Sequence, residues 1–373
     1  MTKVRHVLGI SGGKDSAALA IYMHQKYPEL DIEYYTCDTG KELDETYQLI
    51  ENLEIYLGKK IKRLRAAEES TEDPFDHFLE IYGNFIPFAS ARWCTKSLKL
   101  EPFENFIGDD LVVSYVGIRG DENREGYISQ KTNIQSIFPF RLNIWSEDVI
   151  QKVLAENNLE NLTQILQEIN SQNNNLNLKP FTNVLLRKKN NNFSQDQKLA
   201  QLLGVDTKLF NQLVLNYLKQ TNYPLAYDNH FPLATNDDNL VRSDIFQLLE
   251  DSGIGIPRYY EPVDFEINGQ SVGQYARSRS GCYFCFYQQK IEWVWLYEQH
   301  PDLFKKAMKY EEKSTRSWNG DETLAEMIAP ERIQSIKEEY LKRLRRKNYN
   351  KKSALLLDVL HDTEEEGCAS CFI

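Results

Sequence analysis

Residues 7–16 read VLGISGGKDS. The apolar half predicts a short strand, the glycines break it, and a helical stretch is expected from about Ser16 to Tyr27. Glycines let a backbone approach phosphate oxygens closely, and the N–H groups at a helix N-terminus attract anions. Lys14 adds a positive charge, and the hydroxyls of Ser11 and Ser16 add hydrogen-bond donors. The stretch therefore predicts a phosphate-binding loop in preference to a ligand-free Gly-rich turn.

Strand and helix signals alternate over about the first 145 residues. This alternation predicts an α/β fold, a Rossmann-like parallel sheet with helices on both faces. A second strand, Ile32 to Thr36, runs into Asp38-Thr39-Gly40. Because ligands bind at the carboxyl ends of such strands, we expect Asp38 either to hold Mg²⁺ or to order Lys14. An Asx turn that caps the next helix is a structural alternative, compatible with either role.

The most strand-like segment of the chain, Leu111 to Ile118, leads into GIRGDENR at residues 117–124. Arg119 and Arg124 are suited to bidentate contacts with a phosphate or sulfate on a reacting partner. A surface salt bridge is an equally good interpretation of Arg124.

Composition and charge exclude several classes of protein. The chain has 373 residues, of which 41% are hydrophobic, so it is not mostly disordered. Its net charge of −11 excludes a general nucleic-acid coat but leaves room for a local basic groove. No apolar stretch approaches the length of a membrane span, and the N-terminus lacks a secretory signal. We therefore expect a cytoplasmic protein with no membrane partner and with reduced cysteines.

Changes in composition and residue spacing along the chain predict four regions. Residues 1–149 form the α/β domain with the phosphate loop, and residues 150–242, rich in Asn with Leu and Ile at helical spacing, form a helical insertion. Residues 243–350 form a helical region that completes the active site, and residues 351–373 form a tail containing Cys368 and Cys371.

The remaining cysteines suggest metal or sulfur chemistry. Cys282 and Cys285 form a CxxC pair, and Cys94 lies in the segment RWCTK. Thiolates two residues apart can bind one metal ion or one edge of an iron–sulfur cluster. Three cysteines leave two expectations: a [4Fe–4S] cluster with three protein ligands and an open iron, or a zinc site with a fourth ligand such as Cys37. The alternative is that Cys94 packs in the core while the CxxC thiols hold no metal.

Four segments resemble the phosphoadenylylsulfate (PAPS) reductase family of the pyrophosphate-loop ATPases: SGGKDS, TCDTGKE, RWCTKSLKLEP and GIRGDENREGY. The later GCYFCFYQQKIEWVWL and EQHPDLFKKA are similar to the DNA phosphorothioation branch, the DndC/SspD-type sulfurtransferases. The resemblance covers about residues 4–145 and 275–312, leaves the insertion unassigned, and implies the adenine nucleotide alpha hydrolase type of fold. Thr95 stands where PAPS reductases often have a second cysteine, and the CASCFI end differs from their ECGLH-type tail, which weakens the reductase interpretation.

The resemblance implies an enzyme that uses ATP and Mg²⁺ and releases AMP and pyrophosphate. A DNA backbone phosphate would be adenylated, and sulfur would replace one non-bridging oxygen, in DNA modification or phage defence. The sulfur would come from the cluster or from a persulfide on a cysteine, supplied by a cysteine desulfurase partner and other phosphorothioation proteins. Matched onto this chain, the motifs assign ATP contacts to Ser11, Gly12, Gly13, Lys14, Asp15, Ser16, Asp38 and Gly117, catalysis to Lys14, Asp38, Cys94, Cys282 and Cys285, and acceptor contacts to Arg92, Lys96, Arg119 and Arg124.

Three other functions remain open at this stage. A PAPS or APS reductase would release sulfite from a nucleotide sulfate without consuming ATP. A tRNA thiolation enzyme would use the same loop to modify a base carbonyl. A nucleotide-sensing regulator would bind ATP without turnover.

Overall fold

The computed structural model describes residues 3–122, 131–172 and 178–350. Its centre is a five-stranded sheet in the order β3-β2-β1-β4-β5, and every neighbouring pair of strands is parallel. The strands are β1 (Arg5–Gly9), β2 (Ile32–Asp38), β3 (Ile61–Arg65), β4 (Val112–Tyr115) and β5 (Ile134–Ile137). The predicted parallel sheet is confirmed. Strand order reverses between β1 and β4, which opens a ligand crevice at their carboxyl ends.

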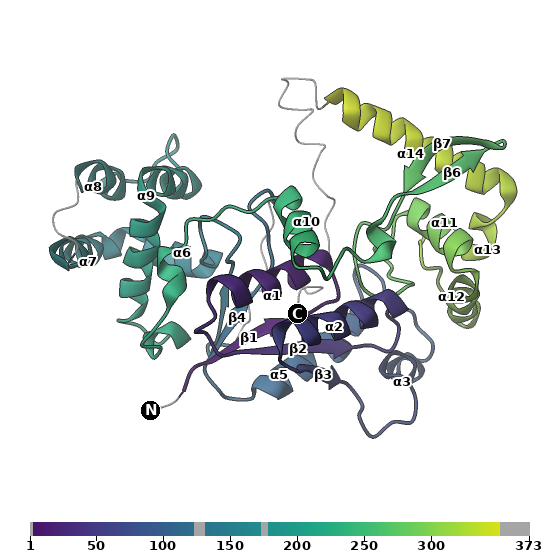
Figure 1. Ribbon diagram of the computed structural model, residues 1–373, viewed down its shortest axis with the longest axis horizontal. Coiled ribbons are helices and arrows are strands. Elements are labelled where there is room, and N and C mark those ends of the chain that lie inside the picture. Colours follow the sequence, from purple (N-terminus) through teal and green to yellow (C-terminus); the bar gives the residue numbers. More distant parts are fainter. Residues whose placement is uncertain (1–2, 123–130, 173–177, 351–373) are drawn as a thin grey trace.

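Helices cover both faces of the sheet, as predicted (Figure 1). Side chains alternate along each strand, so Leu8 and Tyr34 pack in the larger apolar core on the side of α1 (Lys14–Lys26) and α2 (Asp44–Leu57). Their neighbours Val7 and Tyr35 pack on the opposite side, with Phe103 of α5 (Glu101–Ile107). The remaining helices and strands are α3 (Pro74–Ile81), α4 (Trp93–Thr95), η1 (Lys96–Leu100), α6 (Glu147–Val153), α7 (Leu159–Gln172), α8 (Lys179–Leu186), α9 (Gln195–Leu218), α10 (Arg242–Asp251), β6 (Val263–Ile267), β7 (Gln270–Tyr275), α11 (Lys290–Gln299), α12 (Pro301–Lys313), α13 (Leu324–Met327) and α14 (Pro330–Asn350), with short 3-10 turns between some of them.

The insertion is helical, as its Leu and Ile spacing predicts, and α6 to α9 lie at one end of the sheet domain (Figure 1). Its buried side chains, among them Leu162, Phe181 and Phe210, belong to the same apolar core as the α1 side of the sheet. The insertion therefore shares its hydrophobic core with the domain from which it emerges. The boundaries proposed from the sequence remain predictions.

A buried amide, Asn211 of α9, joins the insertion to the sheet domain. Its Oδ1 accepts a hydrogen bond from the indole N–H of Trp145 at 2.9 Å, and its Nδ2 donates to the carbonyl oxygens of Leu142 and Asn236 at 3.1 and 3.0 Å. Asn211 is fully buried, and its bonds to the Trp145 indole and the Asn236 carbonyl are buried with it, so these two groups would be left unpaired in the interior if the side chain were removed.

We expect Asn211→Ala to lower the free energy of unfolding by about 2–4 kcal/mol, because it leaves buried polar groups unpaired and opens a cavity. Asn216→Ala, on an exposed face of the same helix, is the control and should change it by less than about 0.5 kcal/mol. Urea denaturation measures both values. Equal values for the two variants would contradict this account of the junction.

The C-terminal module, comprising the β6–β7 hairpin and helices α11 to α14, lies at the other end of the sheet domain from the insertion (Figure 1). Trp293, Trp295 and Phe304 are buried in its core. Residues 289–312 form two helices, α11 and α12, and not one continuous helix. The break falls at His300, because Pro301 lacks the N–H that would continue the first helix.

No helix among the described residues is both long and apolar enough to cross a bilayer.

Candidate active site

The phosphate loop lies between β1 and α1, at the crevice where strand order reverses. The Ser11 N–H donates to Ser16 Oγ at 3.1 Å, and the Ser16 hydroxyl lies 3.1 Å from the Gly13 carbonyl oxygen, to which it donates.

Gly12 has a φ of +72°, and a Cβ there would collide with the side chain of Thr46. A Cβ on Gly117, at the end of β4, would lie 2.9 Å from the Asp15 carbonyl oxygen. Gly12 therefore lets the loop approach Thr46 of α2, and Gly117 lets the segment after β4 approach the start of α1.

Charged side chains are buried behind the loop. Lys14 Nζ lies 3.1 Å from Asp15 Oδ2, and Arg119 Nη1 lies 2.9 Å from Asp15 Oδ1. Burial acts to raise the pKa of Asp15, but the charges of Lys14 and Arg119 outweigh it and hold the pKa below its usual value. Asp15 is therefore ionised at neutral pH, and the Lys14–Asp15–Arg119 cluster links α1 to the segment that follows β4.

Residues from the C-terminal half of the chain cover the loop. The Tyr259 hydroxyl donates to the Gly12 carbonyl oxygen at 2.5 Å, and the Tyr260 hydroxyl accepts from the backbone N–H of Lys14 at 3.4 Å. The ammonium of Lys14 lies 5.2 Å from the centre of the Tyr260 ring. Ser280 lies over Gly13, since a Cβ on that glycine would be 2.7 Å from the Ser280 hydroxyl.

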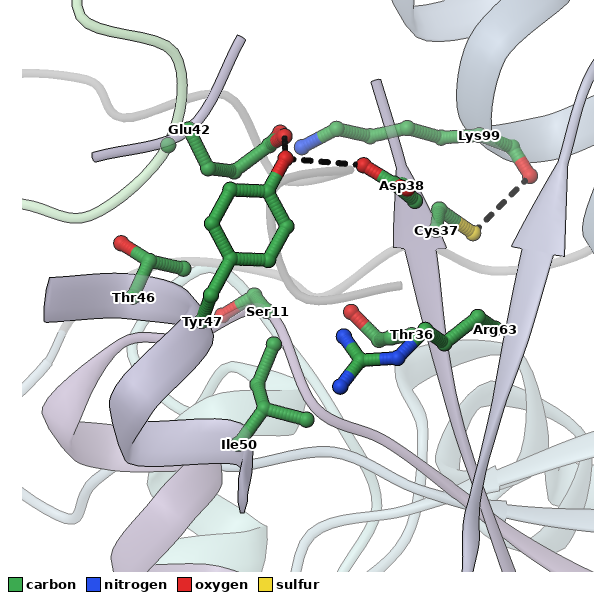
Figure 2. Close-up of a pocket in the computed structure, with 11 residues that line it drawn as sticks. Ser11, Thr36, Cys37, Asp38, Glu42, Thr46, Tyr47, Ile50, Arg63 and Lys99 are labelled. Atoms are coloured by element: carbon green, nitrogen blue, oxygen red, sulfur yellow. Dashed lines mark hydrogen bonds between the residues drawn. The ribbon is translucent and has the colours of Figure 1, made fainter. Parts of the chain in front are cut away.

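A narrow pocket opens beside the loop, at the carboxyl ends of β1 and β2 (Figure 2). Asp38 Oδ1 accepts from the Gly40 N–H at 2.9 Å, which is the Asx turn that the sequence suggested. The Tyr47 hydroxyl lies 3.0 Å from Asp38 Oδ1 and 3.1 Å from Glu42 Oε2, and Figure 2 shows the Lys99 side chain extending toward the same group. The pocket is lined by Ser11, Thr36, Cys37, Asp38, Glu42, Thr46, Tyr47, Ile50, Arg63, Lys99 and Gly281.

The carboxylates of Asp38 and Glu42 fit a magnesium ion that accompanies a nucleotide. Mg²⁺ is commonly held by one or two carboxylates together with substrate phosphates and water, and both side chains line the pocket with Ser11 of the loop. Burial raises the pKa of Glu42, and a nearby divalent cation would favour its ionised form.

The CxxC turn lies next to the pocket, because Gly281, the residue before Cys282, lines it. Cys282 Sγ is 3.2 Å from Thr39 Oγ1, and the Tyr283 N–H donates to the Lys41 carbonyl oxygen at 3.0 Å, which fixes the turn against the end of β2. Cys94 packs against the apolar core of the C-terminal module. Burial raises the pKa of Cys282 and, with smaller opposing effects, of Cys285, so both are neutral thiols at rest.

The predicted three-cysteine metal site does not fit this arrangement. Within residues 3–122, 131–172 and 178–350, no three side chains of His, Cys, Asp or Glu are placed to hold one metal ion. The expectation of a [4Fe–4S] cluster or a zinc site on Cys94, Cys282 and Cys285 is therefore not supported. Cys282 instead contacts the hydroxyl of Thr39 and a carboxylate oxygen of Glu42, while Cys94 packs against apolar side chains.

The four predicted acceptor contacts have different surroundings. Arg92 is exposed, with its guanidinium 5.4 Å from the centre of the Tyr287 ring, and Lys96 is exposed on η1. Arg119 is only 2% exposed and is engaged with carboxylates, so it organises the loop from behind. Arg124, like Cys368 and Cys371 of the tail, lies outside the described residues.

The N-terminal part of the chain matches a known family. Residues 5–167 match the family model of the phosphoadenosine phosphosulfate reductase domain. This chain carries a PAPS reductase domain of the pyrophosphate-loop ATPase superfamily. The fold, the loop at the strand-order reversal and the pocket described above agree with that match.

Curated relatives are similar over parts of this chain. An uncharacterized protein of Methanocaldococcus jannaschii is 35% identical over 153 residues, which are 37% of this chain and 30% of that protein. The tRNA-specific 2-thiouridylases MnmA of Aeromonas hydrophila and Aeromonas salmonicida are each 25% identical over 126 residues, 31% of this chain and 33% of theirs. The chain thus spans about a third of the length of these relatives.

Several residues beside the loop of the PAPS reductase domain were not predicted from the sequence. Tyr259, Tyr260 and Ser280 reach the loop from the C-terminal half, and Lys99 reaches the pocket from η1. Lys99 stands within the quoted RWCTKSLKLEP motif, so its position near Cys94 was a usable signal. The tyrosines had no such signal, because nothing local links RYYEP to a glycine loop about 250 residues away.

We expect Cys282 and Cys285 to react slowly with iodoacetamide at pH 8, because the thiolate is the nucleophile and a raised pKa leaves little of it. Their alkylation rates should keep rising with pH beyond 8.5, where an ordinary thiol is half ionised. Peptide mass spectrometry of the folded protein measures the rates, with the guanidinium-unfolded protein as the control. A plateau below pH 8.5 in the folded protein would contradict the assigned direction of the shift.

Proposed function

We propose that this protein is an ATP-dependent sulfurtransferase that adenylates a phosphate oxygen of a DNA backbone and replaces it by sulfur. One observation supports it above all: the pyrophosphate loop and the CxxC turn border the same pocket, since Ser11 and Gly281 both line it. A nucleotide held by the loop would place its phosphates beside Cys282, the residue after Gly281. Activation and sulfur delivery can then occur in one place.

The first step is adenylation. A non-bridging oxygen of the acceptor phosphate attacks the α-phosphorus of ATP, the bond between the α-phosphorus and the oxygen bridging to the β-phosphate breaks, and pyrophosphate leaves. Lys14 and the N–H groups at the start of α1 stabilise the charge that builds on the leaving pyrophosphate. A magnesium ion at Asp38 and Glu42 would add charge stabilisation of the phosphates when bound.

The second step is sulfur transfer. The terminal sulfur of a Cys282 persulfide attacks the activated phosphorus, the bond to AMP breaks, and AMP leaves. The Cys285 thiolate then attacks Cys282 Sγ, which forms a disulfide and releases the phosphorothioate. A cysteine desulfurase must supply the persulfide sulfur, and a dithiol reductant must restore the two thiols. The positive charge of Lys99 favours both thiolates against the effect of burial.

The test uses the full chain with Mg-ATP, a cysteine desulfurase with cysteine, a dithiol reductant and a short DNA duplex. We expect AMP and pyrophosphate in equal amounts, and a phosphorothioate linkage detected by mass spectrometry after nuclease digestion. Cys282→Ser should still release pyrophosphate but transfer no sulfur. Absence of pyrophosphate release from ATP, or sulfite release from PAPS without ATP, would overturn the proposal.

A second candidate acceptor is tRNA, because part of this chain is similar to proteins named tRNA-specific 2-thiouridylase. The loop and thiols would act in the same way, with a base carbonyl oxygen in place of the phosphate oxygen. Unmodified tRNA in place of the duplex distinguishes the two. Sulfur recovered only in tRNA would decide for this candidate.

A further inference from the structure

Arg277 is a buried arginine that lacks partners for part of its guanidinium. It is 3% exposed, and its Nη2 donates to the Cys282 carbonyl oxygen and to Gln288 Oε1, each at 3.1 Å. Its Nε and Nη1 are buried without a hydrogen-bond partner, and no carboxylate of the described residues forms an ion pair with it. A permanently charged group is costly to bury in this way unless an anion completes its surroundings.

The surroundings of Arg277 point to the anion. Its backbone N–H donates to the Tyr259 carbonyl oxygen at 2.9 Å, and its guanidinium carbon lies 6.0 Å from the centre of the Tyr259 ring. The hydroxyl of Tyr259 holds Gly12, and the neighbouring Tyr260 hydroxyl accepts from Lys14 N. Three residues beyond Arg277, Ser280 contacts Gly13. The arginine therefore belongs to the shell that surrounds the phosphate loop.

We infer that Arg277 is an anion-binding residue that the C-terminal module adds to the loop, and that it contacts the pyrophosphate part of ATP through its unpaired N–H groups. The same guanidinium holds the Cys282 carbonyl, so an occupied loop would order the CxxC turn through one side chain. Arg277 lies outside the PAPS reductase domain match, which ends at residue 167. The inference rests on the proposed function only in that the loop binds a polyphosphate.

The test is binding of inorganic pyrophosphate with Mg²⁺ to the full chain, measured by calorimetry. We expect Arg277→Gln to weaken binding by about 10- to 100-fold, as for loss of charge-assisted hydrogen bonds, and Arg277→Lys to recover part of it. Arg258→Gln is the matched control, because it removes the same charge from an exposed position in the same segment, and it should bind as the wild type does.

A second readout separates binding from a purely structural role. Pyrophosphate should change the alkylation rate of Cys282 in the wild type and change it less in Arg277→Lys, with thermal melting confirming that each variant is folded. If Arg277→Gln does not fold, Arg277→Lys decides. Wild-type affinity in the folded variants, or no pyrophosphate binding by the wild type, would overturn the inference. If Arg277→Gln weakens pyrophosphate binding but the wild type does not cleave ATP, the inference about Arg277 holds and the proposed function fails.

Discussion

Lys14→Ala is expected to lower the rate of pyrophosphate release from ATP by about 100- to 1,000-fold, the usual loss when one preorganised donor to a developing charge is removed. Lys14 is 3% exposed, and its ammonium lies between Asp15 and the Tyr260 ring, at the point where α1 begins. The fold should survive, because Asp15 keeps its ion pair with Arg119. A coupled pyrophosphate assay at saturating ATP measures the effect.

The control for this prediction is Lys26→Ala, which removes a lysine from the exposed far end of the same helix. It should release pyrophosphate within about twofold of the wild-type rate, because Lys26 pairs with Asp238 away from the loop. A rate for Lys14→Ala that is also within twofold would show that the loop does not carry the phosphates.

Arg119→Met should lower the free energy of unfolding by about 3–5 kcal/mol, the usual loss when one partner of a buried ion pair is removed. Arg119 lies 2.9 Å from Asp15, 2.8 Å from Asp121 and 3.0 Å from Glu122, so its loss leaves Asp15 and Glu122 buried with less positive charge around them. Denaturant titration at pH 7 measures the difference. A loss below about 1 kcal/mol would contradict this role.

The stability difference between the wild type and Arg119→Met should depend on pH. Because the pKa of folded Asp15 is lowered, its ion pairs stabilise the protein above the unfolded pKa, and this stabilisation is lost as the pH falls through the folded value. The gap between wild type and Arg119→Met should therefore shrink in acid. Lys3→Ala is the control for a surface ion pair, since Lys3 and Asp31 are both exposed, and it should cost less than about 0.5 kcal/mol.

The sheet and its loop were predictable because their signals are local. The run VLGISGGKDS specifies strand, turn and helix by residue type alone, and the structure has β1 and α1 on either side of the glycines. Strand β5 and the β6–β7 hairpin were not predicted. The residues of β5 include Gln135 and Ser136 and are all buried, so no alternation of polar and apolar residues marked them as a strand.

The site was less predictable than the fold, because its parts meet only through tertiary structure. The CxxC spacing suggested a metal, but the positions of Cys94, Thr39 and Glu42 relative to it depend on packing between distant segments. The ion pair of Arg119 was likewise not predictable from local sequence. An arginine in a Gly-rich turn suits a phosphate contact. In the folded chain, however, Asp15 lies next to Arg119, and the two residues are far apart in the sequence.

The contacts of Tyr259, Tyr260 and Cys282 with the loop side of the site span sequence separations of 247, 246 and 243 residues. Chains fold largely from the N-terminus as they are synthesised, and closing so long a loop must wait until both ends exist. A nascent chain will therefore carry the phosphate loop well before it carries the CxxC turn. The order of biosynthesis therefore delays complete assembly of the site until Tyr259, Tyr260 and Cys282 have been made. Under the proposed function, an unfinished chain could not couple ATP cleavage to sulfur transfer.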